Sequence, residues 1–347
     1  MKRLKSLGFF LLVFSSIFLI QCTTDPIPGI PGDDGADGMD GMDGVNGTTE
    51  CAACHNVSTS EAVHASFLYS KHYENETISR GGSSSCARCH SGNGFVDYID
   101  QVSMKEYTTS QAVLDSPEKI SCTTCHDMHT SFDFETDGFD YALRSLKGVN
   151  LITDEGYTID FNGTSNMCAN CHQPRRSPES EIVPVDGLVE VGRRFGPHHG
   201  PQATMLEGIQ GVELVGSLEY PAIGEAGHRT GSSCTSCHMG EPSGINGNHT
   251  WIPTTEACTQ CHGDTAPGPV TGLEEGMETL FALLEEKGVL EKDEEGEVGI
   301  VSGVYPTLTA EATWNYLLIV EDQSNGVHNP NNAKALIQNS IDALSAD

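Results

Sequence analysis

The sequence is poor in basic residues: 18 lysines and arginines stand against 49 aspartates and glutamates, a formal net charge of −31 at pH 7 with histidine neutral. A protein that binds nucleic acid neutralises phosphates with lysine and arginine, so this balance excludes a nucleic-acid binder. Aromatic residues make up 7% and hydrophobic residues 37% of 347 positions. That is lean for a chain long enough to hold one large domain or two, and it predicts a core partly filled by something other than apolar side chains.

A long apolar run occurs only near the N-terminus. Residues 1–5 are basic and residues 7–20 are almost uninterrupted apolar sequence, a pattern typical of an export signal. The run falls short of the ~20 residues that a membrane span needs, which favours a signal peptide over residues 1–21 rather than an uncleaved membrane anchor.

The end of this run contains a second sequence pattern. Leu-Ile-Gln-Cys at residues 19–22 resembles the bacterial lipobox, which implies lipidation of Cys22, although Gln21 replaces the usual small residue. Thr23 is not the aspartate that retains some lipoproteins at the inner membrane. The resemblance therefore implies an exported bacterial protein anchored by lipid to the outer membrane, at its periplasmic or cell-surface face.

Glycine then recurs at every third position from Gly29 to Gly47, with aspartate at many places between. The period is collagen-like, but proline is scarce and like charges repel across three chains. Residues 22–50 are therefore predicted to form a flexible acidic tether, with a trimeric stalk as the alternative.

The cysteines carry the chemistry. Apart from Cys22, twelve cysteines form six pairs at i and i+3, each followed at once by a histidine. The motifs are Cys51/Cys54/His55, Cys86/Cys89/His90, Cys122/Cys125/His126, Cys168/Cys171/His172, Cys234/Cys237/His238 and Cys258/Cys261/His262. Cys-x-x-Cys-His is the pattern of c-type haem attachment: two thiols one helical turn apart can form thioethers with one porphyrin, and the next residue directs its imidazole at the iron. The sequence predicts six covalent haems with these histidines as proximal ligands.

Three other interpretations explain the cysteines but not the histidines. Structural zinc needs two pairs per ion or spaced histidines, not a histidine after every second cysteine. A disulfide framework suits an exported protein but leaves the histidines unexplained. Thioredoxin-like redox pairs would occur once, in a βαβ unit.

These motifs, over residues 51–262, resemble those of the exported multihaem c-type cytochromes. The resemblance implies a mainly α fold with extensive loops and little β structure, organised around six stacked covalent haems. The porphyrins would supply the buried apolar area that the side chains lack.

Eight histidines remain as candidates for the second axial position of six irons: His64, His72, His129, His198, His199, His228, His249 and His328. Two histidines per iron close both axial positions, whereas methionine would raise the potential. His129 lies too close to its own motif to reach over the same ring, so we expect it to serve a neighbouring haem. His228 and His249 are placed as distal ligands are in the family.

Two choices depend on local sequence. His198 and His199 lie in a Gly-Pro-His-His-Gly-Pro loop, where one of the two is expected to face iron and His199 is favoured. His72 resembles a family ligand segment more than His64 does. Both choices stay open at this point.

Residues 263–347 lack the motif. Apolar residues at helical spacing predict a helix from Leu273 that stops at Gly288, followed by a charged loop through residues 291–297. A second helix capped by Thr309 and a third that starts near Asn331 are expected after it. The segment 324–330 resembles the C-terminal part of nitrite-reductase-type multihaem cytochromes, which implies that the helices pack on the haem domain and that His328 is a distal ligand. The alternative is a free helical hairpin.

The favoured function is electron transfer between membrane or periplasmic donors and an outer or extracellular acceptor, with redox partners that present basic docking surfaces. The alternative is an oxidoreductase of the nitrite, hydroxylamine or sulfur-oxyanion type with one open haem. All six motifs end in histidine, without the lysine typical of ammonia-forming nitrite reductase. Two arginine pairs, 175–176 and 193–194, are expected to bind haem propionates or, less favoured, to line such a site. A filament with ligands shared between subunits is a third alternative.

Overall fold

The computed structural model describes residues 49–101 and 108–347. The predicted signal peptide, Cys22 and nearly all of the tether lie outside them. Residues 53–347 form one compact unit. Within the described ranges, no helix combines the length and apolar character needed to cross a bilayer.

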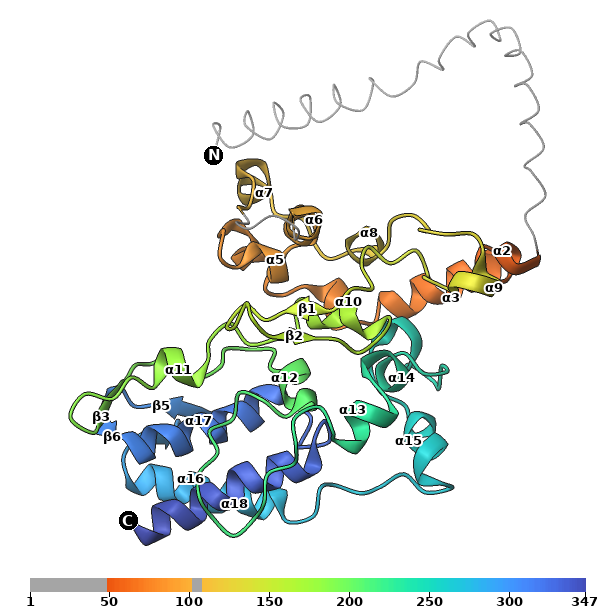
Figure 1. The fold of residues 1–347 in the computed structure, drawn as a ribbon. Coiled ribbons are helices and arrows are strands. Elements are labelled where there is room, and N and C mark those ends of the chain that lie inside the picture. Colours follow the sequence, from red (N-terminus) through yellow and green to blue (C-terminus); the bar gives the residue numbers. More distant parts are fainter. Residues whose placement is uncertain (1–48, 102–107) are drawn as a thin grey trace, which may run out of the picture. The chain divides into compact units, whose positions relative to one another are not determined.

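The described chain is mainly helical, and most of its helices are short and joined by long irregular segments (Figure 1). Through the six motifs these are α2 (Thr49–Cys54), α3 (Val57–Phe67), α4 (Lys71–Glu74), the 3₁₀ helix η1 (Ile78–Gly82), α5 (Ala87–His90), α6 (Gly92–Gln101), α7 (Gln111–Asp115), α8 (Cys122–Cys125), α9 (Phe134–Asp137), α10 (Ser165–Ala169), α11 (Pro178–Glu181), α12 (Gln202–Glu207), α13 (Gly227–Gly231), α14 (Cys234–His238), the 3₁₀ helix η2 (Asn248–Thr250) and α15 (Thr255–His262). Three longer helices follow: α16 (Leu273–Glu286), α17 (Thr307–Asp322) and α18 (Pro330–Ala346).

Strands are few and pair only two at a time in the described chain. The antiparallel pairs are β1 (Val149–Asn150) with β2 (Thr158–Ile159), β3 (Leu188–Val191) with β6 (Gly303–Pro306), and β4 (Leu290–Lys292) with β5 (Val298–Ile300). The predicted class, mainly α with long loops and little β, is confirmed.

Several motif helices begin where serine or threonine can satisfy the first backbone groups. The backbone N–H of Ser233 donates to Ser236 Oγ at 2.8 Å at the start of α14, and the same reciprocal capping joins Ser121 to Thr124 at α8. At α15 the side chain of Thr254 accepts from the N–H of Ala257. These short helices thus depend on capping and tertiary contacts, because a single turn is too short to be stable alone.

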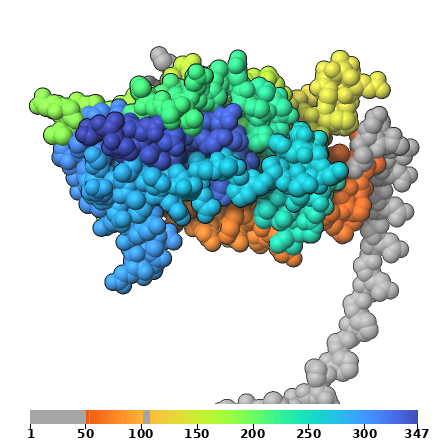
Figure 2. All heavy atoms as spheres, turned by 90° about the horizontal axis from the view of Figure 1, so that it is seen from below, coloured from red at the N-terminus to blue at the C-terminus, as the bar shows by residue number. Residues whose placement is uncertain are grey.

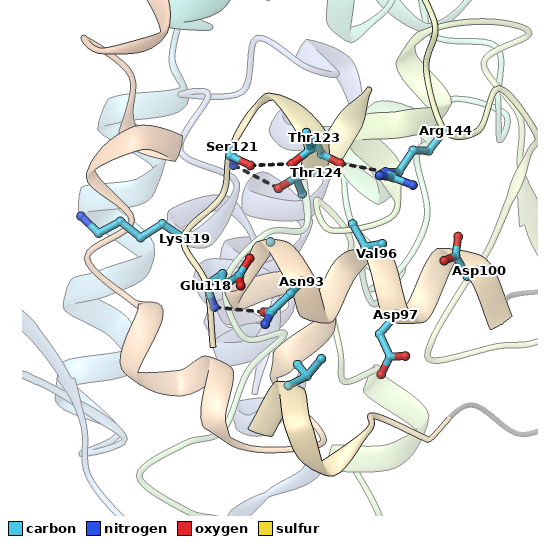
Figure 3. A pocket seen from close by; sticks show the side chains of 12 residues that line it. Asn93, Val96, Asp97, Asp100, Glu118, Lys119, Ser121, Thr123, Thr124 and Arg144 are labelled. Carbon is cyan, nitrogen blue, oxygen red and sulfur yellow. Dashed lines mark hydrogen bonds between the residues drawn. The ribbon is translucent and has the colours of Figure 1, made fainter. Parts of the chain in front are cut away.

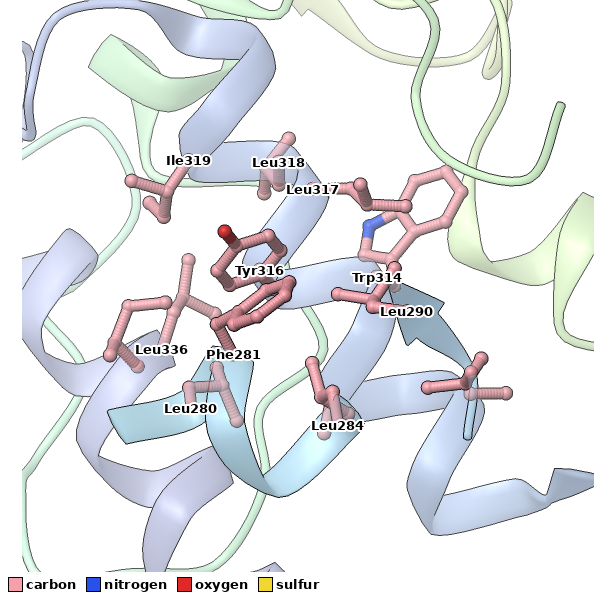
Figure 4. Packing of buried hydrophobic residues seen from close by; sticks show 14 of the residues in the cluster. Leu280, Phe281, Leu284, Leu290, Trp314, Tyr316, Leu317, Leu318, Ile319 and Leu336 are labelled. Carbon is pink, nitrogen blue, oxygen red and sulfur yellow. The ribbon is translucent and has the colours of Figure 1, made fainter. Parts of the chain in front are cut away.

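The largest apolar core lies among α16, α17 and α18 (Figures 1 and 4). Trp314, Leu318 and Leu280 are fully buried there, and each such side chain stabilises the fold by roughly 1.5–3 kcal/mol. The core also takes Val189 and Val191 from β3, so the C-terminal helices pack on a segment that precedes the fifth motif. The indole N–H of Trp314 donates to the carbonyl of Gln210 at 2.7 Å.

The C-terminal elements differ in two details from the sequence expectation. Helix α17 begins at Thr307 rather than after Thr309, because Pro306 ends β6 and enters the helix directly. The charged segment after Gly288, expected as a loop, forms the β4–β5 hairpin, whose exposed tip projects in Figure 2 (light blue).

Candidate functional site

Each of the six motif histidines faces one other histidine ring. The ring centroids are 6.0–6.4 Å apart in every pair. Numbered by motif, the pairs are site 1 His55–His129 (6.1 Å), site 2 His90–His198 (6.4 Å), site 3 His126–His249 (6.2 Å), site 4 His172–His72 (6.0 Å), site 5 His238–His328 (6.2 Å) and site 6 His262–His228 (6.0 Å).

This separation fits two imidazoles bound to opposite faces of one iron. A metal–nitrogen bond of about 2 Å on each side, plus about 1 Å from each nitrogen to its ring centre, places the centroids about 6 Å apart. Aromatic rings in direct edge contact reach similar separations in this chain, as Phe195 and Trp314 do at 5.9 Å, so the argument rests on the recurrence of one such histidine pair at every motif. The six pairs therefore have the spacing that a metal between two imidazoles requires, and each contains the histidine of a motif whose two cysteines suit a c-type haem.

Two solved structures are similar to this chain in fold. The crystal structure of the outer cell wall cytochrome OcwA matches with a TM-score of 0.50 and 21% identity, over 81% of this chain and 50% of that one. The undecahaem cytochrome from the S-layer of Carboxydothermus ferrireducens matches with a TM-score of 0.47 and 17% identity, over 78% and 39%. The chain has the fold of a multihaem cytochrome. It spans half or less of the length of these two proteins, and no family model or curated protein matches it.

The choice between the two adjacent histidines differs from the sequence expectation. The structure turns His198, not His199, toward His90. His198 has a left-handed backbone (φ 67°), and the ring of His199 instead donates through Nδ1 to Glu321 Oε2 at 2.6 Å. The side chain of His199 is 70% exposed. The carboxylate thus holds His199 away from site 2.

Of the two alternatives His64 and His72, the structure pairs His72 with His172. His64 lies exposed on α3 and belongs to none of the six pairs. The remaining expected distal histidines are His129, His228, His249 and His328. Each faces a motif histidine, and none of the four faces the histidine of its nearest preceding motif.

Hydrogen bonds at Nδ1 orient most of these rings. Eight of the twelve bond an acceptor within the described chain: His90 to Thr77 Oγ1, His126 to the Tyr141 carbonyl, His129 to Asp140, His172 to Gln202 Oε1, His228 to the Val327 carbonyl, His238 to the Trp251 carbonyl, His249 to Asn248 Oδ1 and His328 to Asp322. Carbonyl and carboxylate oxygens only accept, so Nδ1 carries the proton and Nε2 keeps the lone pair that a metal needs.

Burial favours the neutral, ligating form of several rings. Burial, together with the charge of neighbouring histidines, lowers the pKa of His72, His198 and His249 to about 4. Burial also lowers the pKa of His172 and His238. At His328 burial acts in the same direction, but the hydrogen bond and charge of Asp322 outweigh it and raise the pKa.

Trp251 lies at the junction of three sites. Its ring stands edge-on to His72 of site 4 at 4.5 Å and to His249 of site 3 at 5.4 Å between centroids. Its carbonyl accepts from Nδ1 of His238 in site 5 at 2.8 Å. Its left-handed backbone (φ 55°) at the end of η2 allows one residue to contact all three histidines. No motif marked this residue in the sequence.

The cysteines of site 4 lie beside those of its neighbours. Cys171 lies close enough to Cys89 in site 2 to raise its own pKa through that neighbour, and Cys168 is affected in the same way by Cys234 in site 5. Cys125 of site 3 packs with Cys171 on the small cluster around Phe95. No disulfide joins the motifs in the described chain. Site 4 is therefore adjacent to sites 2, 3 and 5.

Positive charge gathers near site 2. Arg175 Nη1 lies 3.8 Å from Cys86 Sγ, and with Arg80 its charge adds to burial in lowering the pKa of His90. Arg176 pairs with Glu181 at 3.7 Å and also acts on His198. Arg193 and Arg194 are exposed after β3.

A shallow cavity of about 390 Å³ opens beside the third motif (Figure 3). Its wall carries Asp97, Asp100 and Glu118 together with Lys119 and Arg144. The residues that line it include no histidine or cysteine, so it is separate from the paired rings.

Proposed function

We propose that this protein is an electron carrier that binds six c-type haems, each between two histidines. The observation that carries the proposal is the set of six ring pairs at 6.0–6.4 Å, each containing one motif histidine. A c-type haem with two imidazole ligands exchanges one electron at its iron and offers no free position to a substrate.

The residues have the following proposed roles. The twelve motif cysteines attach the haems, and His55, His90, His126, His172, His238 and His262 are the proximal ligands. The distal ligands are His72, His129, His198, His228, His249 and His328, with His198 in place of the His199 favoured by the sequence. Nδ1 acceptors such as Gln202 and Asn248 hold the rings in the ligating orientation.

The surroundings of the protein are also part of the proposal. The similar protein OcwA is an outer cell wall cytochrome, and the predicted signal peptide supports export of this chain as well. We propose that Cys22 anchors it by lipid to the outer membrane and that residues 22–50 serve as a tether. The net charge of −31 favours redox partners with basic docking surfaces.

The experiment that tests the proposal is electron paramagnetic resonance of the oxidised holoprotein with and without nitrite or cyanide. We expect only low-spin signals that do not respond to either ligand, because every motif histidine has a partner. A high-spin centre that binds nitrite or cyanide would instead support the reductase with one open haem.

A further inference from the structure

The Nδ1 acceptors divide the sites into two electrostatic classes. Of the eight hydrogen bonds, six end on neutral hydroxyl, amide or carbonyl oxygens. The other two end on carboxylates: His129 bonds Asp140 Oδ1 in site 1, and His328 bonds Asp322 Oδ1 in site 5, each at 2.6 Å.

Asp322 is enclosed by the end of α17. Its side chain is 0% exposed, and its other side-chain contact in the described chain is the hydroxyl of Ser324. Left-handed residues at Gln323, Asn325 and Gly326 turn the chain back so that His328 returns to the carboxylate. The negative charge of Asp322 is therefore held next to one ligand, with little water to screen it.

Asp140 holds its ligand in a different way. It is 7% exposed and accepts from His129 Nδ1, from the N–H and hydroxyl of Thr130 and from the N–H of Ala142. Four donors share its charge, whereas Asp322 has two.

A carboxylate that accepts from a ligand's Nδ1–H makes the imidazole a stronger electron donor to the metal. This stabilises the oxidised, more positive iron and lowers the reduction potential. Neutral acceptors have a weaker effect, and the arginines near site 2 act in the opposite direction.

We infer that sites 1 and 5 are the two haem sites of lowest potential, set by Asp140 and Asp322, with site 5 the lower of the two. The inference rests on the proposed function. It means that these two sites are the last to be reduced as electrons enter the protein.

Isosteric substitutions in the holoprotein test whether removing a carboxylate raises the reduction potential of its site and whether adding one lowers it. Asp322→Asn and Asp140→Asn each remove one carboxylate and keep an oxygen that can accept from Nδ1. Asn248→Asp adds a carboxylate at site 3, where Asn248 Oδ1 accepts from His249 at 2.5 Å. The left-handed backbone of residue 248 (φ 51°) suits aspartate as well as asparagine.

The readout is a spectroelectrochemical titration, with haem content and the low-spin signals measured on the same samples. We expect the lowest of six components to shift upward in Asp322→Asn, the next lowest to shift upward less in Asp140→Asn, and one higher component to shift downward in Asn248→Asp. Unchanged reduction potentials in the variants would overturn the inference, and so would shifts confined to the higher-potential components in the two Asn variants. If such samples still contained six low-spin haems, the proposed function would remain valid. A wild-type protein with fewer than six such haems would overturn both.

Discussion

At the scale of single residues, the two adjacent histidines of the 197–201 loop give the sharpest test of the ligand assignment. His198→Ala removes the ring that faces His90, so one of six sites should lose its second axial ligand. We expect one new high-spin signal in electron paramagnetic resonance. The matched control is His199→Ala, which removes only the bond to Glu321 and should keep all six low-spin signals. The reverse pattern would restore His199 as the ligand.

Trp251 is a positioning residue for ligands of three sites. Trp251→Ala removes the ring contacts to His72 and His249 but keeps the backbone carbonyl that accepts from His238. We expect altered g-values for two of the six centres and a loss of roughly 2 kcal/mol in unfolding free energy, because the side chain is only half-buried. Unchanged signals in a less stable protein would mean that Trp251 only fills space.

The sequence predicts the attachment chemistry at this scale because the cysteines and the proximal histidine are contiguous. It could not decide between His198 and His199, since the left-handed backbone of His198 and the carboxylate of Glu321 are set by distant parts of the chain. The acceptors Asp140 and Asp322 carry no local motif for the same reason.

At the scale of elements, the turn between α17 and α18 positions His328. Gly326 has a φ of 79°, and a Cβ there would collide with Leu273 Cδ2 at the start of α16. Gly326→Ala should therefore cost about 2–4 kcal/mol of unfolding free energy and loosen the site 5 ligand. Thermal unfolding and the low-spin signal of site 5 measure the two effects.

Gly288→Ala is the matched control for the turn. Gly288 has a similar φ of 75° but nothing within 4 Å of an added Cβ, so only backbone strain of about 1 kcal/mol is expected. Equal losses in the two variants would show that the contact with Leu273 has no role in holding the turn.

The three C-terminal helices could be predicted because their apolar residues recur at helical spacing over several turns. The β3–β6 pairing could not, since Val189 and Tyr305 are brought together only by the tertiary fold. The β4–β5 hairpin was missed because the composition of its charged tip indicates a loop.

At the scale of the whole molecule, site 4 is adjacent to three other sites, whereas the cysteines of site 6 are partly or fully exposed. Removing the haem attachment of site 4 with Cys168→Ala and Cys171→Ala should lower the melting temperature and change the low-spin signals of sites 2, 3 and 5. The corresponding Cys258→Ala and Cys261→Ala pair should remove one haem with smaller effects on the remaining signals. Equal disturbance by both pairs would contradict a central position for site 4.

The low hydrophobic content of the sequence corresponds to an uneven distribution of apolar cores in the structure. The large apolar core belongs to α16–α18 and the segments packed on them, while the clusters around the motifs, such as that of Phe95 and Tyr98, are much smaller. Composition could predict this shortage but not where in the chain the larger core would lie.

The most direct test of the central claim is the intact mass of the holoprotein, purified from a host that attaches c-type haem. The account predicts six covalently bound haems per chain, one for each Cys-x-x-Cys-His motif. A mass with fewer haems, or one that corresponds to the polypeptide alone, would contradict it.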